Sequence, residues 1–187
     1  YAINDFPLIP KYTVLDPSMT YSLPPHLTST TGMDAMTHAV EAYIGGSTTI
    51  STRRYAVEAV RLINENILTA YREPHNEQAR ANMLHAAYLA GMAFTKSYVG
   101  YVHAVAHSLG GQYHTPHGLA NSVLLPIVLE MYGTHAERRL AKLARKSGIT
   151  DEHDDHTAAT IFIARLRELN GAMQIPSRLE GIQDADI

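Results

Sequence analysis

The stretch GYVHAVAHSLGGQYHTPHGLANSVLLP, residues 100–126, decides the fold because it predicts two helices joined by a tight return. It holds four histidines: His103, His107, His114 and His117. His103 and His107 stand four residues apart among small apolar residues, so a helix places both imidazoles on one face. Gly110-Gly111 predicts the end of that helix, and Thr115-Pro116 predicts the N-cap and first residue of the next. His117 then falls in the first turn of the second helix, where the return can bring it back toward His103.

From Thr28 onward, before and after this stretch, the sequence pattern predicts helices joined by short loops. Thr31-Gly-Met-Asp34 matches a capping box at the start of one helix. Pro126 predicts a kink in another, and one more helix is expected near Asp184. The predicted helices are Met33–Tyr43, Thr52–Tyr71, Glu77–Val99, Pro116–Tyr132, His135–Ser147 and Asp155–Asn170. The expected fold is therefore mainly α, a multi-helix bundle of about six or seven helices.

The first 25 residues differ from the rest, because they are rich in proline and lack helical periodicity. A short β-like run, Tyr12-Thr-Val-Leu15, is closed by Asp16-Pro17. One strand cannot form a sheet alone, so we expect its partners to belong to a domain outside this chain. We interpret residues 1–25 as a strand and linker remnant, and residues 26–187 as one helical domain.

Composition narrows the class of protein. Hydrophobic residues make up 45% of the chain and charged residues 18%, as in ordinary globular proteins. The net charge is −3 and the sequence has no basic stripe, and both observations argue against a nucleic-acid or membrane partner. There is no cysteine, which excludes disulfides and thiolate ligands, and no apolar run is long enough to span a membrane. We expect a soluble, cytoplasmic protein.

The eleven histidines suggest metal binding, because histidine is a common ligand of transition metals. Asp34 and His38 stand four apart on one predicted helix, as His103 and His107 do on another. With His117, these pairs can converge on one ion in a bundle core. Imidazole ligands suit Fe, Zn, Cu and Ni, and three imidazoles with one carboxylate favour a Lewis-acid site. Alternatively, Asp34 is a helix-capping carboxylate and His38 an ordinary histidine.

Two other metal sites do not fit. His103-Ala-Val-Ala-His107 has the spacing of a zincin helix, but Ala104 stands where the general-base glutamate is needed. A di-iron carboxylate bundle needs Glu-x-x-His pairs, which the core helices lack.

The segments TGMDAMTHAVEAY, residues 31–43, and VHAVAHSLGGQYHTPHGLANSVLLP, residues 102–126, resemble the iron-containing, group III alcohol dehydrogenases. The resemblance implies a dehydroquinate synthase-like helical C-terminal domain. It also implies that Asp34, His38, His103 and His117 bind the metal, Fe²⁺, with Zn²⁺ or Ni²⁺ as possible replacements. His107 would be the catalytic histidine that faces the nicotinamide.

The same resemblance implies that NAD or NADP lies against Met19, Ser22, Leu23 and His107. This family binds the dinucleotide through an N-terminal domain with a Gly-Gly-Gly-Ser turn after a strand. Gly45-Gly46-Ser47 is the comparable run here, but it follows a helix and lacks the third glycine. We therefore expect the chain to be a metal-binding C-terminal domain, cut at both ends or naturally truncated, whose partner is the missing nucleotide-binding domain. A homodimer is the expected assembly.

The implied activity is hydride transfer between a small primary alcohol or aldehyde and NAD(P). The chain alone is expected to bind metal but not to be fully active. Two rivals stay open: a metal-dependent lyase or synthase of related architecture, and a non-catalytic helical module for metal binding or oligomer contact.

Overall fold

The computed structural model describes residues 10–182, and these residues form one short 3-10 helix and seven α-helices. In order they are η2 (Pro17–Thr20), α1 (Pro25–Ile44), α2 (Ile50–Arg72), α3 (Glu77–Ser97), α4 (Tyr101–Tyr113), α5 (His117–Tyr132), α6 (Thr134–Lys146) and α7 (Asp155–Ala172). The prediction of a helical bundle is confirmed. The predicted helices 52–71, 77–99, 135–147 and 155–170 match α2, α3, α6 and α7 to within two residues at each end.

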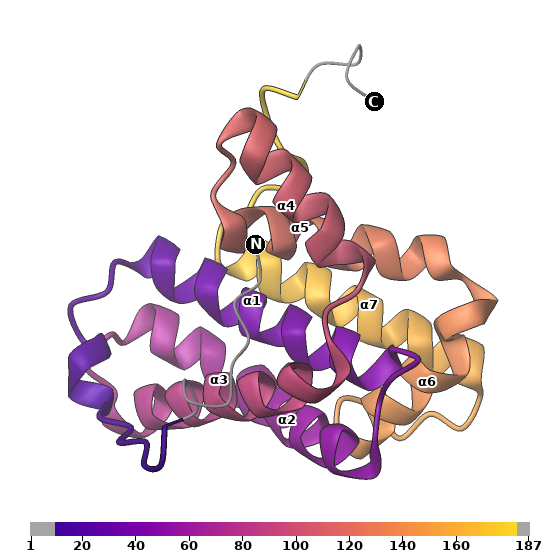
Figure 1. The fold of residues 1–187 in the computed structure, drawn as a ribbon, viewed down its shortest axis with the longest axis horizontal. Helices are drawn as coiled ribbons and strands as arrows, with labels where there is room; N and C mark the ends of the chain where they lie inside the picture. The colour runs from indigo at the N-terminus through magenta and orange to yellow at the C-terminus, as the bar shows by residue number, and fades with distance from the viewer. Residues whose placement is uncertain (1–9, 183–187) are drawn as a thin grey trace.

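Helix α1 lies at the centre of the bundle. It packs against α2 and α3 on one side and against α5 and α6 on the other, while α4 projects beyond it (Figure 1). Met33, Met36 and Val40 are fully buried. Because neighbours cover α1 on several sides, polar side chains such as Thr37 and Glu41 are buried as well, and there they need hydrogen-bond partners.

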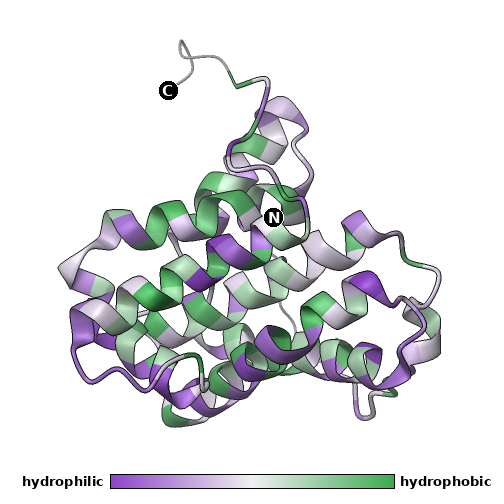
Figure 2. Ribbon diagram, turned by 180° about the vertical axis from the view of Figure 1, so that it is seen from behind, coloured by the Kyte–Doolittle hydropathy of each residue, from purple (hydrophilic) through white to green (hydrophobic). Residues whose placement is uncertain are grey.

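The other helices each bury one face. Hydrophobic and hydrophilic residues are interspersed along the ribbon of most helices (Figure 2). In α6, for example, Leu140 and Leu143 are buried while Arg138 and Lys142 are exposed. This pattern lets α6 and α7 pack together and close one side of the core around Phe162 and Leu166.

The predicted capping box at Thr31 is wrong. Helix α1 begins at Pro25, with Pro24 as its N-cap, so Thr31 lies inside the helix. The Thr31 hydroxyl donates a hydrogen bond of 2.6 Å to the backbone oxygen of Leu27. Proline suits the first helical position, and threonine can bond back to the preceding turn, so the helix starts earlier than the pattern indicated. Asp34 is therefore not a cap.

The predicted strand at residues 12–15 is also wrong within the described part of the chain. The segment has no regular structure, and the side chains of Tyr12 and Val14 are 90% and 89% exposed. No described strand lies beside it to share backbone hydrogen bonds, and an isolated strand is not stable.

The turn between α4 and α5 differs in detail from the prediction. Helix α4 continues through Gly110-Gly111 and ends at Tyr113, where His114 adopts a left-handed conformation with φ of 55°. Pro116 rather than Thr115 is the N-cap of α5, and His117 is its first residue. The expected place of His117 in the first turn is thus confirmed. Pro126 lies within α5.

None of the helices in residues 10–182 is long and apolar enough to cross a membrane. The helix expected near Asp184, and the first part of the predicted 1–25 linker, fall outside the described residues.

Candidate metal centre

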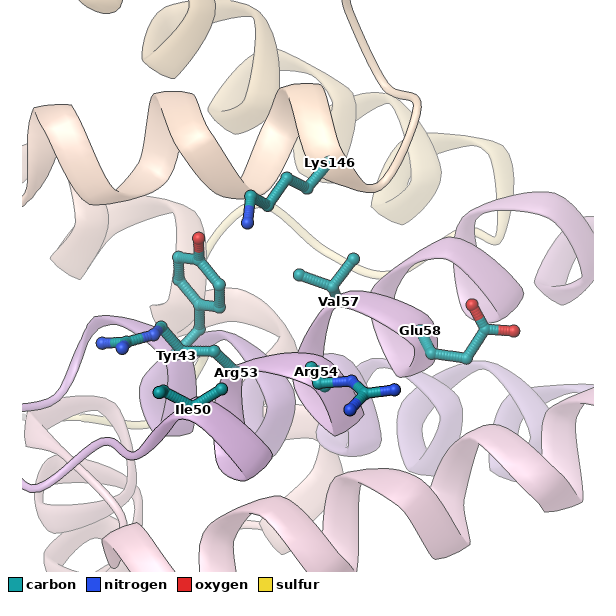
Figure 3. Close-up of a pocket in the computed structure, with 7 residues that line it drawn as sticks. All are labelled: Tyr43, Ile50, Arg53, Arg54, Val57, Glu58 and Lys146. Atoms are coloured by element: carbon teal, nitrogen blue, oxygen red, sulfur yellow. The ribbon is translucent and has the colours of Figure 1, made fainter.

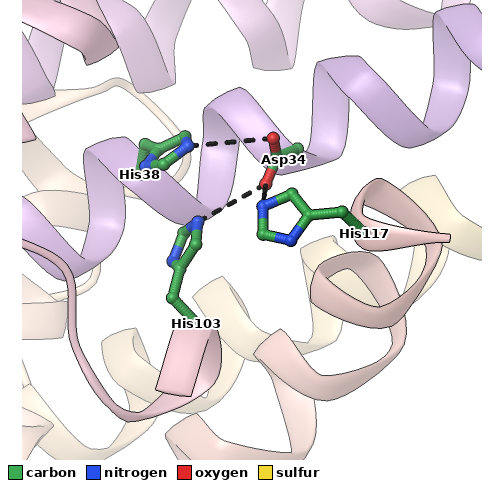
Figure 4. Close-up of side chains that lie close together, drawn as sticks. All are labelled: Asp34, His38, His103 and His117. Carbon is green, nitrogen blue, oxygen red and sulfur yellow. Dashed lines mark ion pairs between the residues drawn. The ribbon is translucent and has the colours of Figure 1, made fainter. Parts of the chain in front are cut away.

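Four potential metal ligands from three helices meet at one point. Helix α1 supplies Asp34 and His38, α4 supplies His103, and α5 supplies His117 (Figure 4). One donor atom from each of the four lies within 4.8 Å of the others. The two α1 side chains share a face because they are one helical turn apart. Their meeting with His103 and His117 is set by helix packing.

Close packing of α5 against α1 helps to bring His117 to Asp34. Gly118, the residue after His117, lies directly against the backbone of Thr30 in α1: a Cβ at position 118 would be 2.8 Å from the Thr30 carbonyl oxygen. The absence of a side chain at this position therefore allows the first turn of α5 to approach α1.

The distances within the cluster suit ligands of a shared ion better than hydrogen-bonded partners. Asp34 Oδ1 lies 3.5 Å from both His103 Nε2 and His117 Nε2, and Asp34 Oδ2 lies 3.7 Å from His38 Nε2. These separations are longer than usual N–H···O hydrogen bonds. Two ligands bound tetrahedrally at about 2.1 Å from one ion are about 3.4 Å apart.

Burial of the donors also fits a metal. The His103 side chain is 1% exposed, and its Nε2 has no hydrogen-bond partner among the described residues. A buried polar nitrogen without a partner destabilises a protein by about 1–3 kcal/mol, which a coordinated cation would remove. Three imidazoles and one carboxylate match the preferences of divalent iron, zinc and nickel.

The cluster places its two inner histidines in opposite electrostatic environments. Burial lowers the pKa of His38 to about 4, and the nearby His103 contributes to the decrease. Burial alone would lower the pKa of His103 too, but the Asp34 and Glu41 carboxylates outweigh it and raise the pKa to about 9. Burial works to raise the pKa of Asp34, yet His103 and His38 hold it below its ordinary value. At neutral pH a metal would thus find Asp34 ionised and His38 neutral, and would displace a proton from His103.

Comparison with known proteins shows to which family the chain belongs. The sequence pattern described as "Fe-containing alcohol dehydrogenase family, C-terminal" matches residues 28–187. The chain belongs to the Fe-containing alcohol dehydrogenase family. All four residues of the cluster lie within the matched range.

Relatives in this iron-containing family are about twice as long as the chain. Alcohol dehydrogenase 4 of Saccharomyces cerevisiae is 43% identical over 189 aligned residues, covering 99% of this chain and 48% of the relative. NADPH-dependent butanol dehydrogenase of Clostridium saccharobutylicum is 36% identical over 180 residues, covering 96% and 46%. A crystal structure of 1,3-propanediol oxidoreductase superposes with a TM-score of 0.88 at 41% identity, covering 91% of this chain and 46% of that one. The chain thus spans about half the length of these relatives.

Sequence reasoning missed two buried residues beside the cluster. Glu41 accepts a hydrogen bond from His103 Nδ1 at 2.6 Å, and Asn121 Nδ2 donates to Asp34 Oδ1 at 2.6 Å. Both residues could have been found from helical spacing. Glu41 is one turn beyond His38 on α1, and Asn121 is one turn beyond His117 on α5, so each shares a helix face with a ligand candidate.

His107 lies next to the four but not among them. Its side chain is exposed, and its ring centre is 5.1 Å from that of His117 and 6.1 Å from that of His103. Its limited burial and the neighbouring His117 lower the pKa of His107. His107 therefore lies close to the four clustered residues, and its catalytic role stays a prediction.

The residues predicted to line the cofactor precede the central helix. Met19 lies in η2 and is 78% exposed, Ser22 is exposed, and Leu23 is half-buried just before α1. Their contact with a dinucleotide stays a prediction.

A separate hollow of about 680 Å³ lies between the end of α1, the start of α2 and the end of α6 (Figure 3). It is lined by Tyr43, Ile50, Arg53, Arg54, Val57, Glu58 and Lys146. It contains none of the four cluster residues, so this hollow is separate from the candidate metal centre.

Proposed function

We propose that this chain is the metal-binding catalytic half of an NAD(P)-dependent alcohol dehydrogenase. Its reaction would be hydride transfer between a small primary alcohol or aldehyde and the nicotinamide. The observation that carries this proposal is the gathering of Asp34, His38, His103 and His117 within 4.8 Å, in a chain of a family described as Fe-containing.

Under this proposal the four residues hold one Fe²⁺, and Zn²⁺ or Ni²⁺ can take its place. A single carboxylate leaves a divalent ion with one net positive charge, and four protein ligands leave space for a substrate oxygen. The bound ion supplies Lewis-acid polarisation of the alcohol or carbonyl oxygen. The His117 side chain is 44% exposed, whereas that of His103 is buried. Substrate would therefore approach from the side of His117.

The surrounding side chains have separate roles in this scheme. His38 stacks on Phe94 with ring centres 4.3 Å apart, which fixes its ring and keeps water from that side. His107 lies on the exposed side, next to His117. In the direction of alcohol oxidation, His107 would accept the hydroxyl proton, directly or through solvent, as the hydride passes to the nicotinamide.

The dinucleotide would lie against Met19, Ser22, Leu23 and His107. The relatives are about twice as long as this chain, which supports residues 1–25 as a linker to a nucleotide-binding domain and residues 26–187 as the catalytic domain. A homodimer is part of the same proposal. One relative is named an NADPH-dependent butanol dehydrogenase.

Metal analysis tests the proposal most directly. The chain, loaded anaerobically with Fe²⁺ or with Zn²⁺, should bind one ion, and His38→Ala and His117→Ala should bind far less. His85→Ala is the matched control, because His85 is an exposed histidine on α3 outside the cluster. Equal metal content in all four proteins would refute the site. A second assay follows NADH formation from small alcohols by the protein that includes the nucleotide-binding domain. A dehydrogenase forms NADH, whereas a lyase or synthase forms its product without net NADH.

A further inference from the structure

We propose that Glu41 is a positioning residue that fixes His103 in the tautomer able to bind the metal. The Glu41 carboxylate would hold the proton on His103 Nδ1 and so present the Nε2 lone pair to the ion. This inference rests on the proposed metal site, but its structural basis is a set of contacts within the chain itself.

Glu41 is a buried carboxylate with three N–H donors around it. Its side chain is 1% exposed. It accepts hydrogen bonds from the backbone N–H of Gly100 at 2.8 Å and of Val102 at 2.7 Å, and from His103 Nδ1 at 2.6 Å. A buried charge is tolerated when hydrogen bonds of this kind replace its lost hydration. All three donors belong to the start of α4, some 60 residues away in the sequence.

The same carboxylate caps α4 from outside the helix. Gly100, the N-cap, has no side chain with which to satisfy the free N–H groups of the first turn. A Cβ at position 100 would lie 2.7 Å from Glu41 Oε1, so the glycine leaves room for this carboxylate. Just before it, Tyr98 adopts φ of 63° and ψ of −178°, a conformation that non-glycine residues rarely hold without support.

The direction of the bond to His103 follows from the chemistry of the acceptor. A carboxylate only accepts hydrogen bonds, so Nδ1 must be the donor. When the ring is neutral, its one proton is therefore on Nδ1, and the free Nε2 faces Asp34 Oδ1 at 3.5 Å (Figure 4). Metal-binding histidines are commonly held by a carboxylate in this way. Glu41 thus sets both the rotation of the ring and the identity of the free nitrogen.

Glu41→Gln tests this role, because glutamine keeps the shape but replaces one acceptor oxygen with an NH₂ group. Its remaining oxygen can still cap α4, whereas the NH₂ group would donate to Nδ1 and favour the tautomer protonated at Nε2. We expect the dissociation constant for Zn²⁺ to rise roughly 10–100-fold. Thr49→Ala is the matched control: it removes the side-chain cap of α2, which is not part of the cluster, and should lower stability while leaving zinc affinity unchanged.

Nuclear magnetic resonance of ¹⁵N-labelled histidine supplies a second readout. In the metal-free chain at a pH above the raised pKa of His103, where the ring is neutral, Nδ1 should carry the proton, and in Glu41→Gln the proton should lie on Nε2 instead. Unchanged zinc affinity in a folded Glu41→Gln variant would reduce Glu41 to a helix cap and overturn the inference. If that variant does not fold, an unprotonated Nδ1 in the unsubstituted chain overturns it equally, and a protonated one supports it. Should the unsubstituted chain bind no Zn²⁺, the proposed function fails, while the Nδ1 proton still decides whether Glu41 sets the tautomer.

Discussion

Replacing Gly118 with alanine should show whether the close approach of α5 to α1 positions the metal ligands. In the native chain, a Cβ at this position would lie 2.8 Å from the carbonyl oxygen of Thr30, whereas ordinary contacts begin at 3.4 Å. The obstacle is a backbone carbonyl of the neighbouring helix, so rotation of a side chain cannot relieve it. Helix α5 would have to move about 0.6 Å away from α1, the difference between those two distances.

That displacement affects both stability and metal binding. Overpacking of this kind destabilises a protein by about 1–3 kcal/mol. The first turn of α5 carries His117, and metal–ligand distances tolerate changes of only about 0.2 Å. A shift of about 0.6 Å therefore exceeds what the site can absorb without rearrangement. We expect the Zn²⁺ dissociation constant of Gly118→Ala to rise by roughly 10–100-fold, the range found when the support of a ligand is lost.

Gly91→Ala is the matched control. Gly91 lies inside α3, and a Cβ there would meet nothing within 4 Å. Alanine should stabilise this helix by about 1 kcal/mol, because it is the better helix former. Urea unfolding of the metal-free variants should thus show Gly118→Ala less stable than Gly91→Ala by about 2–4 kcal/mol, the loss at position 118 plus the gain at position 91. Calorimetric titration with Zn²⁺ gives the affinities. If the two variants are equally stable and bind zinc alike, the close approach of α5 to α1 does not control the site.

Four further outcomes are expected. Zn²⁺ at 100 times its dissociation constant should raise the free energy of unfolding by about 2.7 kcal/mol, and a chelator should remove the gain; urea curves that coincide with and without metal would contradict this. His107→Ala should keep the zinc affinity of the unsubstituted chain in calorimetric titration, because His107 is not among the four clustered donors; a large loss would make it a ligand. Glu137→Gln should lower the raised pKa of His156 toward 6.5, as followed by NMR titration, since Glu137 accepts its hydrogen bond; the stabilisation from this pair is complete below pH 6.5 and is lost as the pH rises through the raised pKa. Phe162→Ala should reduce stability by about 3–5 kcal/mol in urea unfolding, because Phe162 is fully buried, and a change below 1 kcal/mol would show that the core is not packed as described.

Local pattern in the sequence was sufficient for most of the helices and for pairs of residues within them. Apolar spacing identified α2, α3, α6 and α7, because helical periodicity depends on neighbouring residues alone. The same geometry places Asp34 and His38 on one face of α1 from their spacing of four residues. Resemblance to a family then singled out the four clustered residues, and the structure brings them together.

Helix ends were less predictable, because several local signals compete there. Thr31 looked like a cap, but the prolines at 24 and 25 start α1 earlier and the threonine hydroxyl bonds back along the helix. Gly110-Gly111 looked like a stop, yet α4 ends only where His114 turns left-handed. The β-like run at 12–15 has the composition of a strand but no described neighbour to pair with.

By itself the sequence determined which residue types recur at helical spacing, and hence the helices, the family and the donors available for a metal. Only the tertiary structure decided that Asp34 meets His103 and His117, that Glu41 holds Nδ1 of His103 from 62 positions away, and that Asn121 reaches Asp34 across 87. The physical reason is one of range. A helical turn fixes neighbours three or four residues apart through backbone geometry, whereas contacts between α1, α4 and α5 depend on how whole helices pack, down to the missing side chain of Gly118.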